Sequence, residues 1–230
     1  MFSCIITAGG SGNRFDKHRK KQFFTINNKP ILNITIDNFY HIDEINEIII
    51  SLPADEYENI GASLIDIYPN KVKCVVGGIN RQASVMNALN VCNDSNKYVL
   101  IQDAVRPFIN RDDLKQMMSM MKDNLAVIPA NKVKNTLKKV NANKIIETID
   151  REDLIEVYTP QIFDLKMIKD FHHNVKDSKL VFTDDASIFE YFKETVIWYE
   201  TKDINIKITT KEDMRYAEYI WHEMEIKCTE

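Results

Sequence analysis

The first half of the chain alternates short, continuous apolar runs with segments of helical periodicity. Apolar runs of strand length occupy residues 2–7, 48–50, 72–76, 98–102 and 125–129. Helical patterns occupy residues 31–39, 55–67, 81–91 and 111–121. Apolar runs without polar alternation are typical of strands that are buried on both faces, in a parallel sheet covered by helices. We therefore expect an α/β fold of three layers, with helices on both sides of a mostly parallel sheet.

The first apolar run leads into a glycine turn and then into a basic segment. The turn reads AGGSGNRF from Ala8, and HRKKQF follows from His18. Backbone N–H groups exposed at the carboxyl end of a strand, with Arg14 and Lys21 nearby, favour binding of a polyphosphate. The dinucleotide-binding pattern G-x-G-x-x-G is incomplete because Phe15 replaces the third glycine, and the P-loop pattern is missing. We therefore expect a Rossmann-like αβα sandwich whose phosphate site is suited to chemistry on the phosphates.

Two further strand ends should meet this turn, because ligands in such sheets bind at the carboxyl ends of the strands. Gly77-Gly78 follows the third strand, and the next helix carries Arg81 and Ser84 in its first turn. That pattern alone indicates only a polar helix start. Asp103 lies at the tip of the fourth strand and is followed by Arg106. A carboxylate in this position is a candidate ligand for Mg²⁺.

Residues 132–151 interrupt the alternation. Two β-prone runs, at residues 133–140 and 144–149, flank the turn formers Asn141-Ala142-Asn143 and predict a hairpin. An isolated hairpin has little core of its own, so we expect an arm that packs on a second copy of the chain. The remainder predicts a helix capped by Thr183–Ala186, a strand at 195–200 and a final helix that begins at Thr209 or Thr210. We expect one domain over residues 1–230, with 132–151 as its arm.

Composition narrows the functional class and the compartment. A net charge of −4 argues against a general nucleic-acid binder, and no apolar stretch approaches the length of a membrane span. No basic segment precedes the first apolar run, so we expect no signal peptide. The cysteines, Cys4, Cys74, Cys92 and Cys228, contain no C-x-x-C pair and indicate a reducing cytoplasm. His172-His173 has the pattern of a polar helix end, not of a metal site.

Nine segments spread over nearly the whole chain form a recognisable set. They are AGGSGNR, KKQF, GGINRQASVMNAL, QDAVRPF, NTLKKV, TIDR, TPQIF, TDDAS and NIKITTKEDM. In this order and spacing they resemble the 2-C-methyl-D-erythritol 4-phosphate (MEP) cytidylyltransferases, which join CMP from CTP to a sugar-alcohol phosphate in isoprenoid precursor synthesis. The ribitol-5-phosphate cytidylyltransferases of cell-wall and capsule synthesis share much of this set.

The resemblance implies a role for each matching residue. Catalysis falls to the cations Arg14, Lys21 and Lys207, and the Mg²⁺ ligand is Asp103. The nucleotide is bound by small residues, namely Ala8, Gly9, Gly10, Gly78 and Ser84. The acceptor is bound by Arg106, Thr136, Arg151 and Thr159. The family also implies a homodimer, in which the arm carries Arg151 towards the site of the other copy.

Four positions depart from the usual family pattern. Lys20 replaces a proline, Gln102 a histidine, Asn135 an aspartate and Gly9 a frequent alanine. Gly9 and Asn135 leave the ribitol phosphate alternative open, whereas TIDR, RQASVMNAL and TDDAS favour MEP. Two other classes receive less support. A dinucleotide-dependent oxidoreductase needs the missing third glycine, and a non-catalytic nucleotide sensor is expected to have lost a phosphate-binding cation.

Overall fold

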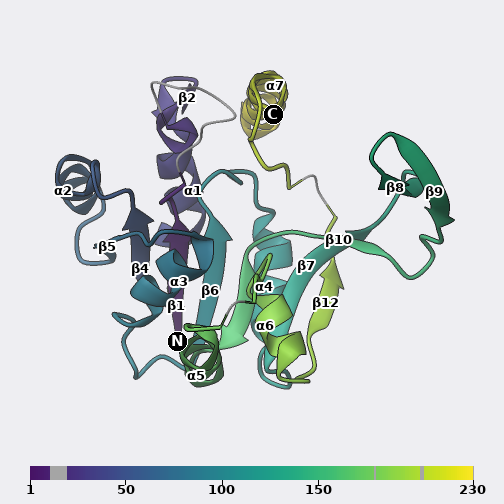
Figure 1. Ribbon diagram of the computed structural model, residues 1–230. Helices are drawn as coiled ribbons and strands as arrows, with labels where there is room; N and C mark the ends of the chain where they lie inside the picture. Colours follow the sequence, from purple (N-terminus) through teal and green to yellow (C-terminus); the bar gives the residue numbers. More distant parts are fainter. Residues whose placement is uncertain (11–19, 179, 203–204, 230) are drawn as a thin grey trace.

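A mixed sheet forms the middle layer of the fold (Figure 1). The computed structural model describes residues 1–10, 20–178, 180–202 and 205–229, with side chains up to residue 224. Four parallel strands make one half of the sheet, in the order β6, β1, β4, β5. They are β1 (Phe2–Thr7), β4 (Ile45–Leu52), β5 (Val72–Val76) and β6 (Tyr98–Asp103). The carboxyl ends of these strands therefore lie along one edge, as the apolar runs predict.

In the other half of the sheet, two strands run antiparallel to their neighbours. Strand β11 (Gln161–Asp164) lies between β6 and β7 (Ala126–Lys132) and is antiparallel to both. Strand β12 (Ile197–Glu200) runs parallel to β7, and β10 (Ile155–Val157) pairs with the end of β7. The short strands β10 and β11 were not predicted, because they have too few residues to give a periodic pattern. The sheet is mostly parallel, as expected.

Helices cover both faces of the sheet, which confirms the three-layer prediction (Figure 1). One face carries α1 (Ile31–Tyr40), α2 (Tyr57–Ile67) and α4 (Arg111–Met120). The opposite face carries α3 (Arg81–Leu89), α5 (Leu165–Val175) and α6 (Ala186–Tyr191). The last helix, α7 (Lys211–Thr229), packs through Ala217 against a separate small cluster that includes Ile31 and Ile208. Among the described helices, none is long and apolar enough to cross a membrane.

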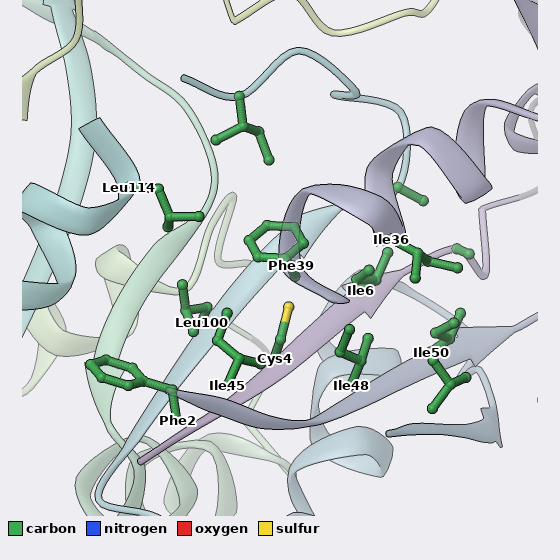
Figure 2. Close-up of a cluster of buried hydrophobic side chains, with 14 of the residues drawn as sticks. Phe2, Cys4, Ile6, Ile36, Phe39, Ile45, Ile48, Ile50, Leu100 and Leu114 are labelled. Carbon is green, nitrogen blue, oxygen red and sulfur yellow. The ribbon is translucent and has the colours of Figure 1, made fainter. Parts of the chain in front are cut away.

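Strand β1 shows why the apolar runs are continuous. Cys4 and Ile6 point into the cluster under α1, where they meet Ile36 and Phe39 (Figure 2). Ile5 lies between them in sequence and belongs to the cluster on the other face. Successive side chains of a strand point to opposite faces, so a strand between two helix layers is apolar at every position. The core thereby fixes where β1 ends and where the glycine turn begins.

The predicted arm is a two-stranded hairpin that projects away from the main sheet (Figure 1). Strands β8 (Leu137–Asn141) and β9 (Lys144–Ile149) pair with each other in a sheet of their own. Most of their residues are exposed in the single chain. A second small hairpin, β2 (Thr25–Ile26) and β3 (Lys29–Pro30), follows the short helix η1 (Lys21–Phe23) near the site.

Candidate functional site

Two cavities open at the carboxyl edge of the parallel strands. The first has a volume of about 460 Å³ and is bounded by the turn after β1, the loop between β5 and α3, and the tip of β6. The second has a volume of about 230 Å³ and is bounded by β6, the segment between β10 and β11, and residues 183–184. Arg81, Asp103 and Lys207 line both cavities. The two cavities therefore meet at one carboxylate and two cations.

The first cavity has a narrow part in which two stretches of backbone approach each other. A Cβ atom added to Gly9 would lie 3.2 Å from Ser84 Oγ and 3.6 Å from Gly77 Cα. A Cβ atom added to Gly78 would overlap the Cβ of Ala83. The Gly78 N–H donates to Ser84 Oγ at 3.0 Å, which ties the loop to α3. A side chain at Gly78 would displace the loop from α3, and one at Gly9 would narrow the slot beside Ser84.

Gln22 of helix η1 shapes the other wall of this cavity. It is 2 % exposed, and its Nε2 donates to the carbonyl oxygens of Ala8 at 2.6 Å and Gly10 at 3.2 Å. These bonds hold the described part of the glycine turn against the segment that carries Lys21. Gln22 belongs to the KKQF segment, and the family resemblance implied no role for it.

Asp103 is the centre of charge between the cavities. Lys207 Nζ lies 2.8 Å from Asp103 Oδ2, Arg81 Nε lies 3.4 Å from Oδ1, and Arg106 Nε lies 3.6 Å from Oδ2. Burial alone would raise the pKa of Asp103, but the positive charges of Arg81, Lys207 and Arg106 hold this pKa well below its usual range. The carboxylate is therefore ionised. Three cations around one carboxylate leave an excess of positive charge for an incoming anion.

Lys207 reaches the site from an extended segment that precedes α7. Its neighbours Ile206 and Ile208 pack in the small cluster under α7, and Ile208 N–H donates to Val105 O at 2.9 Å. Alternation in an extended chain then directs Lys207 to the opposite side, towards the cavities. Asp213 fixes the start of α7, since its Oδ2 accepts from the N–H groups of Thr209 and Thr210 at 2.8 Å.

Arg106 and Thr159 are held together in the second cavity. Arg106 Nη1 donates to Asn205 O at 2.6 Å, and its guanidinium carbon lies 5.2 Å from the ring centroid of Tyr158. Thr159 Oγ1 accepts from the Asp103 N–H at 3.0 Å, and Thr159 O accepts from Asn205 Nδ2 at 2.8 Å. Arg106 Nε is buried and makes no hydrogen bond within the described residues. It faces Asp103 Oδ2, so the positive charge of Arg106 lies beside that carboxylate in the second cavity.

A buried carboxylate and a buried imidazole lie behind Arg81. Arg81 Nη1 lies 2.7 Å from Asp185 Oδ2, and Asp185 Oδ1 lies 3.1 Å from His172 Nε2. Asp185 and His172 are each 1 % exposed. Burial alone would raise the pKa of Asp185, but Arg81 and His172 lower it below the usual value. The predicted helix end is confirmed, because His172 and His173 lie in the last turn of α5 and His173 is exposed, but the side chain of His172 turns inward. At α6 it is Asp184, not Asp185, whose side chain accepts the capping N–H, from Ser187 at 3.1 Å.

The structure brings most of the predicted site residues together. The first cavity is lined by Ala8, Gly9, Gly10, Lys21, Gly78, Ser84, Asp103 and Lys207. The second is lined by Arg106 and Thr159, with Asp103 and Lys207 shared. Thr136 and Arg151 are exposed at the base of the arm and line neither cavity; Arg151 donates to Lys134 O. Arg14 lies outside the described residues. Arg81, which the sequence indicated only as a helix start, lines both cavities.

One metal ligand is available where the cavities meet. The described residues contain no cluster of three or more His, Cys, Asp or Glu side chains. Asp103 is ionised and lines both cavities, so it fits a Mg²⁺ ion that takes most of its oxygen ligands from a bound triphosphate.

Comparison with known proteins gives one consistent result. The family of 2-C-methyl-D-erythritol 4-phosphate cytidylyltransferases (IspD) matches residues 2–223. The enzyme of that name from Clostridium botulinum is 36% identical over 222 residues, covering 96% of this chain and 99% of the relative. The one from Halalkalibacterium halodurans is 34% identical and covers 97% and 98% of the two chains.

Solved structures agree with the sequence comparison. The 4-diphosphocytidyl-2C-methyl-D-erythritol synthase of Anaerococcus prevotii superposes with a TM-score of 0.83 at 31% identity, covering 96% of this chain and 98% of that one. The Francisella tularensis MEP cytidylyltransferase gives a TM-score of 0.81 at 29% identity and covers 95% and 98%. With its two cavities at the carboxyl edge of the sheet and a match over nearly its whole length, the chain belongs to the 2-C-methyl-D-erythritol 4-phosphate cytidylyltransferase family.

Proposed function

We propose that this protein transfers the CMP group of CTP to 2-C-methyl-D-erythritol 4-phosphate and releases pyrophosphate, a step of isoprenoid precursor synthesis in the cytoplasm. The observation that carries the proposal is the meeting of two cavities at Asp103, with Arg81, Arg106 and Lys207 around it. Transfer between two anions needs adjoining pockets and a surplus of positive charge at their junction. The relatives compared here carry the MEP name, which places the ribitol phosphate alternative second.

CTP would occupy the first cavity. The narrow part beside Gly9, Gly78 and Ser84 suits a small, flat ring such as cytosine, with backbone and hydroxyl groups near enough to hydrogen-bond to its edge. Ala8 and Gly10 would lie along the nucleotide, and the triphosphate would extend towards Lys21 and Lys207. Arg14 belongs to this set through the family resemblance.

Asp103 would hold Mg²⁺ together with the phosphates of CTP. A bound Mg²⁺ would neutralise charge on the triphosphate. Asp103 pairs with Lys207 in the free protein, so nucleotide binding would turn the Lys207 ammonium from the carboxylate towards the phosphate.

The acceptor would enter through the second cavity. Arg106 and Thr159 would bind it there, because both line this cavity, Arg106 brings a positive charge, and Thr159 is fixed by its hydrogen bond with the Asp103 N–H. Thr136 and Arg151 cannot act on the cavities from their place at the base of the arm in the same chain. We therefore assign them to the site of a second copy in a homodimer.

The arm itself supports this dimer. Val140, Ile145 and Ile146 are 60%, 66% and 56% exposed on a hairpin without a core of its own. Apolar side chains concentrated on a projecting hairpin are typical of a surface that another protein covers. The dimer would bury these side chains and add Arg151 to an acceptor site that one chain leaves open.

In the reaction, an oxygen of the acceptor phosphate attacks the α-phosphorus of CTP and the pyrophosphate group leaves. Arg14, Lys21 and Lys207 would stabilise the negative charge on the five-coordinate phosphorus and on the leaving group. Arg106 and Arg151 would keep the attacking oxygen in line with the breaking bond. Catalysis of this kind depends on position and electrostatics and needs no covalent intermediate with the protein.

The direct test is pyrophosphate release from CTP with MEP, ribitol 5-phosphate and other alditol phosphates in parallel, with the product identified by mass spectrometry. We expect turnover with MEP and a product of the mass of CDP-methylerythritol. Turnover only with ribitol 5-phosphate would show that this compound is the acceptor, with the same transfer of CMP. No turnover with any acceptor would contradict the proposal.

A further inference from the structure

We propose that Arg81 contacts the phosphate groups where the two cavities meet, and that the buried pair Asp185–His172 positions its guanidinium there. The inference rests on the proposed function and extends it to three residues that the family resemblance left without a role. Arg81 is a catalytic residue in this account, because it would touch the reacting groups. Asp185 and His172 act through Arg81 and are positioning residues.

The place of Arg81 is the first argument. It begins α3 directly after Asn80, whose side chain accepts from Ala83 N–H at 2.8 Å and fixes the first turn of that helix. From there its side chain lines the nucleotide cavity and the acceptor cavity. It remains 29% exposed, so part of the guanidinium faces the open site. An arginine in this place can donate to phosphates on both sides of the junction.

The orientation of Arg81 is the second argument. Its Nε faces Asp103 at 3.4 Å, whereas its Nη1 makes the closer contact, 2.7 Å, with Asp185. The two carboxylates belong to different elements and engage different nitrogens. The contact with Asp185 is the shorter of the two, so it restrains the orientation of the guanidinium plane more strongly. Without it, the guanidinium would be free to turn fully onto Asp103 and neutralise the carboxylate that the mechanism needs.

The surroundings of Asp185 are the third argument. His172 on α5 supplies a second partner at 3.1 Å, and Gln161 on β11 accepts from the N–H groups of Asp185 and Ala186 at 3.2 and 3.1 Å. A carboxylate and an imidazole that are both 1% exposed cost free energy to desolvate, and their mutual contact must offset that cost before it adds to the stability of the fold. A gain in fold stability therefore explains the burial of Asp185 and His172 poorly, whereas the need to orient Arg81 explains it well.

A double-mutant cycle tests the inference. The variants are Arg81→Ala, Asp185→Asn and the combination of both, assayed for kcat and for both KM values with CTP and MEP. We expect kcat to fall about 100-fold in Arg81→Ala and about 10- to 100-fold in Asp185→Asn. In the Arg81→Ala background, Asp185→Asn should change kcat by less than about twofold, because its effect passes through Arg81.

A matched control separates positioning from general damage. Glu47→Gln alters a buried carboxylate at the amino ends of the strands, where Glu47 is 4% exposed and pairs with the partly exposed Lys73. It should lower the melting temperature and leave kcat within about twofold of wild type. If Asp185→Asn does not fold, His172→Gln takes its place in the cycle, with an expected loss of kcat of about fivefold.

The possible results of the double-mutant cycle separate the role of Arg81 from the proposed function. A wild-type kcat in Arg81→Ala would overturn the inference. So would a double variant whose fold-loss of kcat equals the product of the two single losses. Either result would leave the proposed function standing. No turnover by the wild-type protein with any acceptor would instead contradict the proposed function, and the inference with it. A loss confined to Asp185→Asn and Arg81→Ala, with coupling between them, supports it.

Discussion

Two buried carboxylates at opposite ends of the same sheet have opposite surroundings. Glu47, near the amino end of β4, accepts from Ser3 Oγ at 2.6 Å, from Asn93 N–H at 2.7 Å and from Lys73 Nζ at 2.8 Å. Asp103, at the carboxyl end of β6, faces three cations and lines two cavities. Glu47 lines neither of these two cavities.

The difference separates a structural charge from a functional one. The Glu47 network has one cation for one anion, and neutral donors complete it, so nothing in it is left to bind a ligand. The Asp103 network has more positive charge than Asp103 can balance, and it borders open space. Buried charge alone therefore does not identify a site; an unbalanced group of charges beside a cavity does.

The largest effect is expected from removing a cation at the carboxyl end. Lys207→Ala and Lys21→Ala should each lower kcat by about 100- to 1,000-fold, since each removes a charge that stabilises the transition state. Both variants should keep the wild-type fold by circular dichroism. The matched control is Lys73→Ala, which removes a cation at the amino end and should leave kcat within about twofold. Near wild-type turnover in Lys21→Ala would exclude that residue from the mechanism.

The second effect concerns stability at the amino end. Glu47→Gln should lower the free energy of unfolding by about 1–3 kcal/mol, because a neutral amide replaces a carboxylate that accepts hydrogen bonds from four donors. Urea denaturation measures this change. If the Glu47→Gln protein were as stable as wild type but had a reduced kcat, Glu47 would have a functional role and not a structural one.

A smaller effect is expected in the narrow part of the first cavity. Gly78→Ala should raise KM for CTP about tenfold, because the added methyl group overlaps Ala83 and displaces the loop that borders the slot. Gly61→Ala is the control, since a Cβ atom there would meet Cys74 Cβ at an ordinary 3.5 Å. Equal KM values for CTP in Gly78→Ala and wild type would show that the base binds elsewhere.

The smallest effect is a dependence of stability on pH. Burial alone would raise the pKa of Glu47, but its hydrogen bonds with Lys73 and Ser3 lower it below the usual value. Its stabilising contribution is thus fully present above about pH 5 and is lost as the pH falls through the folded-state pKa. Unfolding measured from pH 7 to pH 3 should show a shallower loss of stability in Glu47→Gln than in wild type. Parallel curves would contradict this origin of the acid sensitivity.

Much of the sheet and part of the site could be predicted from the sequence, for a physical reason. Strands buried on both faces are mostly apolar, so β1, β4 and β6 appear as nearly continuous apolar runs, and the polar residues at their carboxyl ends mark the site. Asp103 and the glycines follow from this logic. Lys207 does not, because it stands in a segment without periodic structure, and it entered through the family resemblance alone.

The remaining site residues depend on contacts between distant parts of the chain. Asp185 stands in a sequence typical of a helix cap, and His172 in one typical of a polar helix end. The contacts of Asp185 with Arg81 and with His172 arise only when α5 and α6 pack on the same face as α3. Strand β11, which lies between β6 and β7, was not predicted either, because its four residues are too few to show a hydrophobic period.

The most direct test of the account is calorimetry of CTP binding in the presence of Mg²⁺, with the wild-type protein, Lys207→Ala and Lys73→Ala. If the surplus of positive charge at the carboxyl end binds the triphosphate, CTP will bind the wild-type protein, Lys207→Ala will bind it at least about tenfold more weakly, and Lys73→Ala will match wild type. Absence of binding to the wild-type protein, or equal weakening in the two variants, would contradict the account.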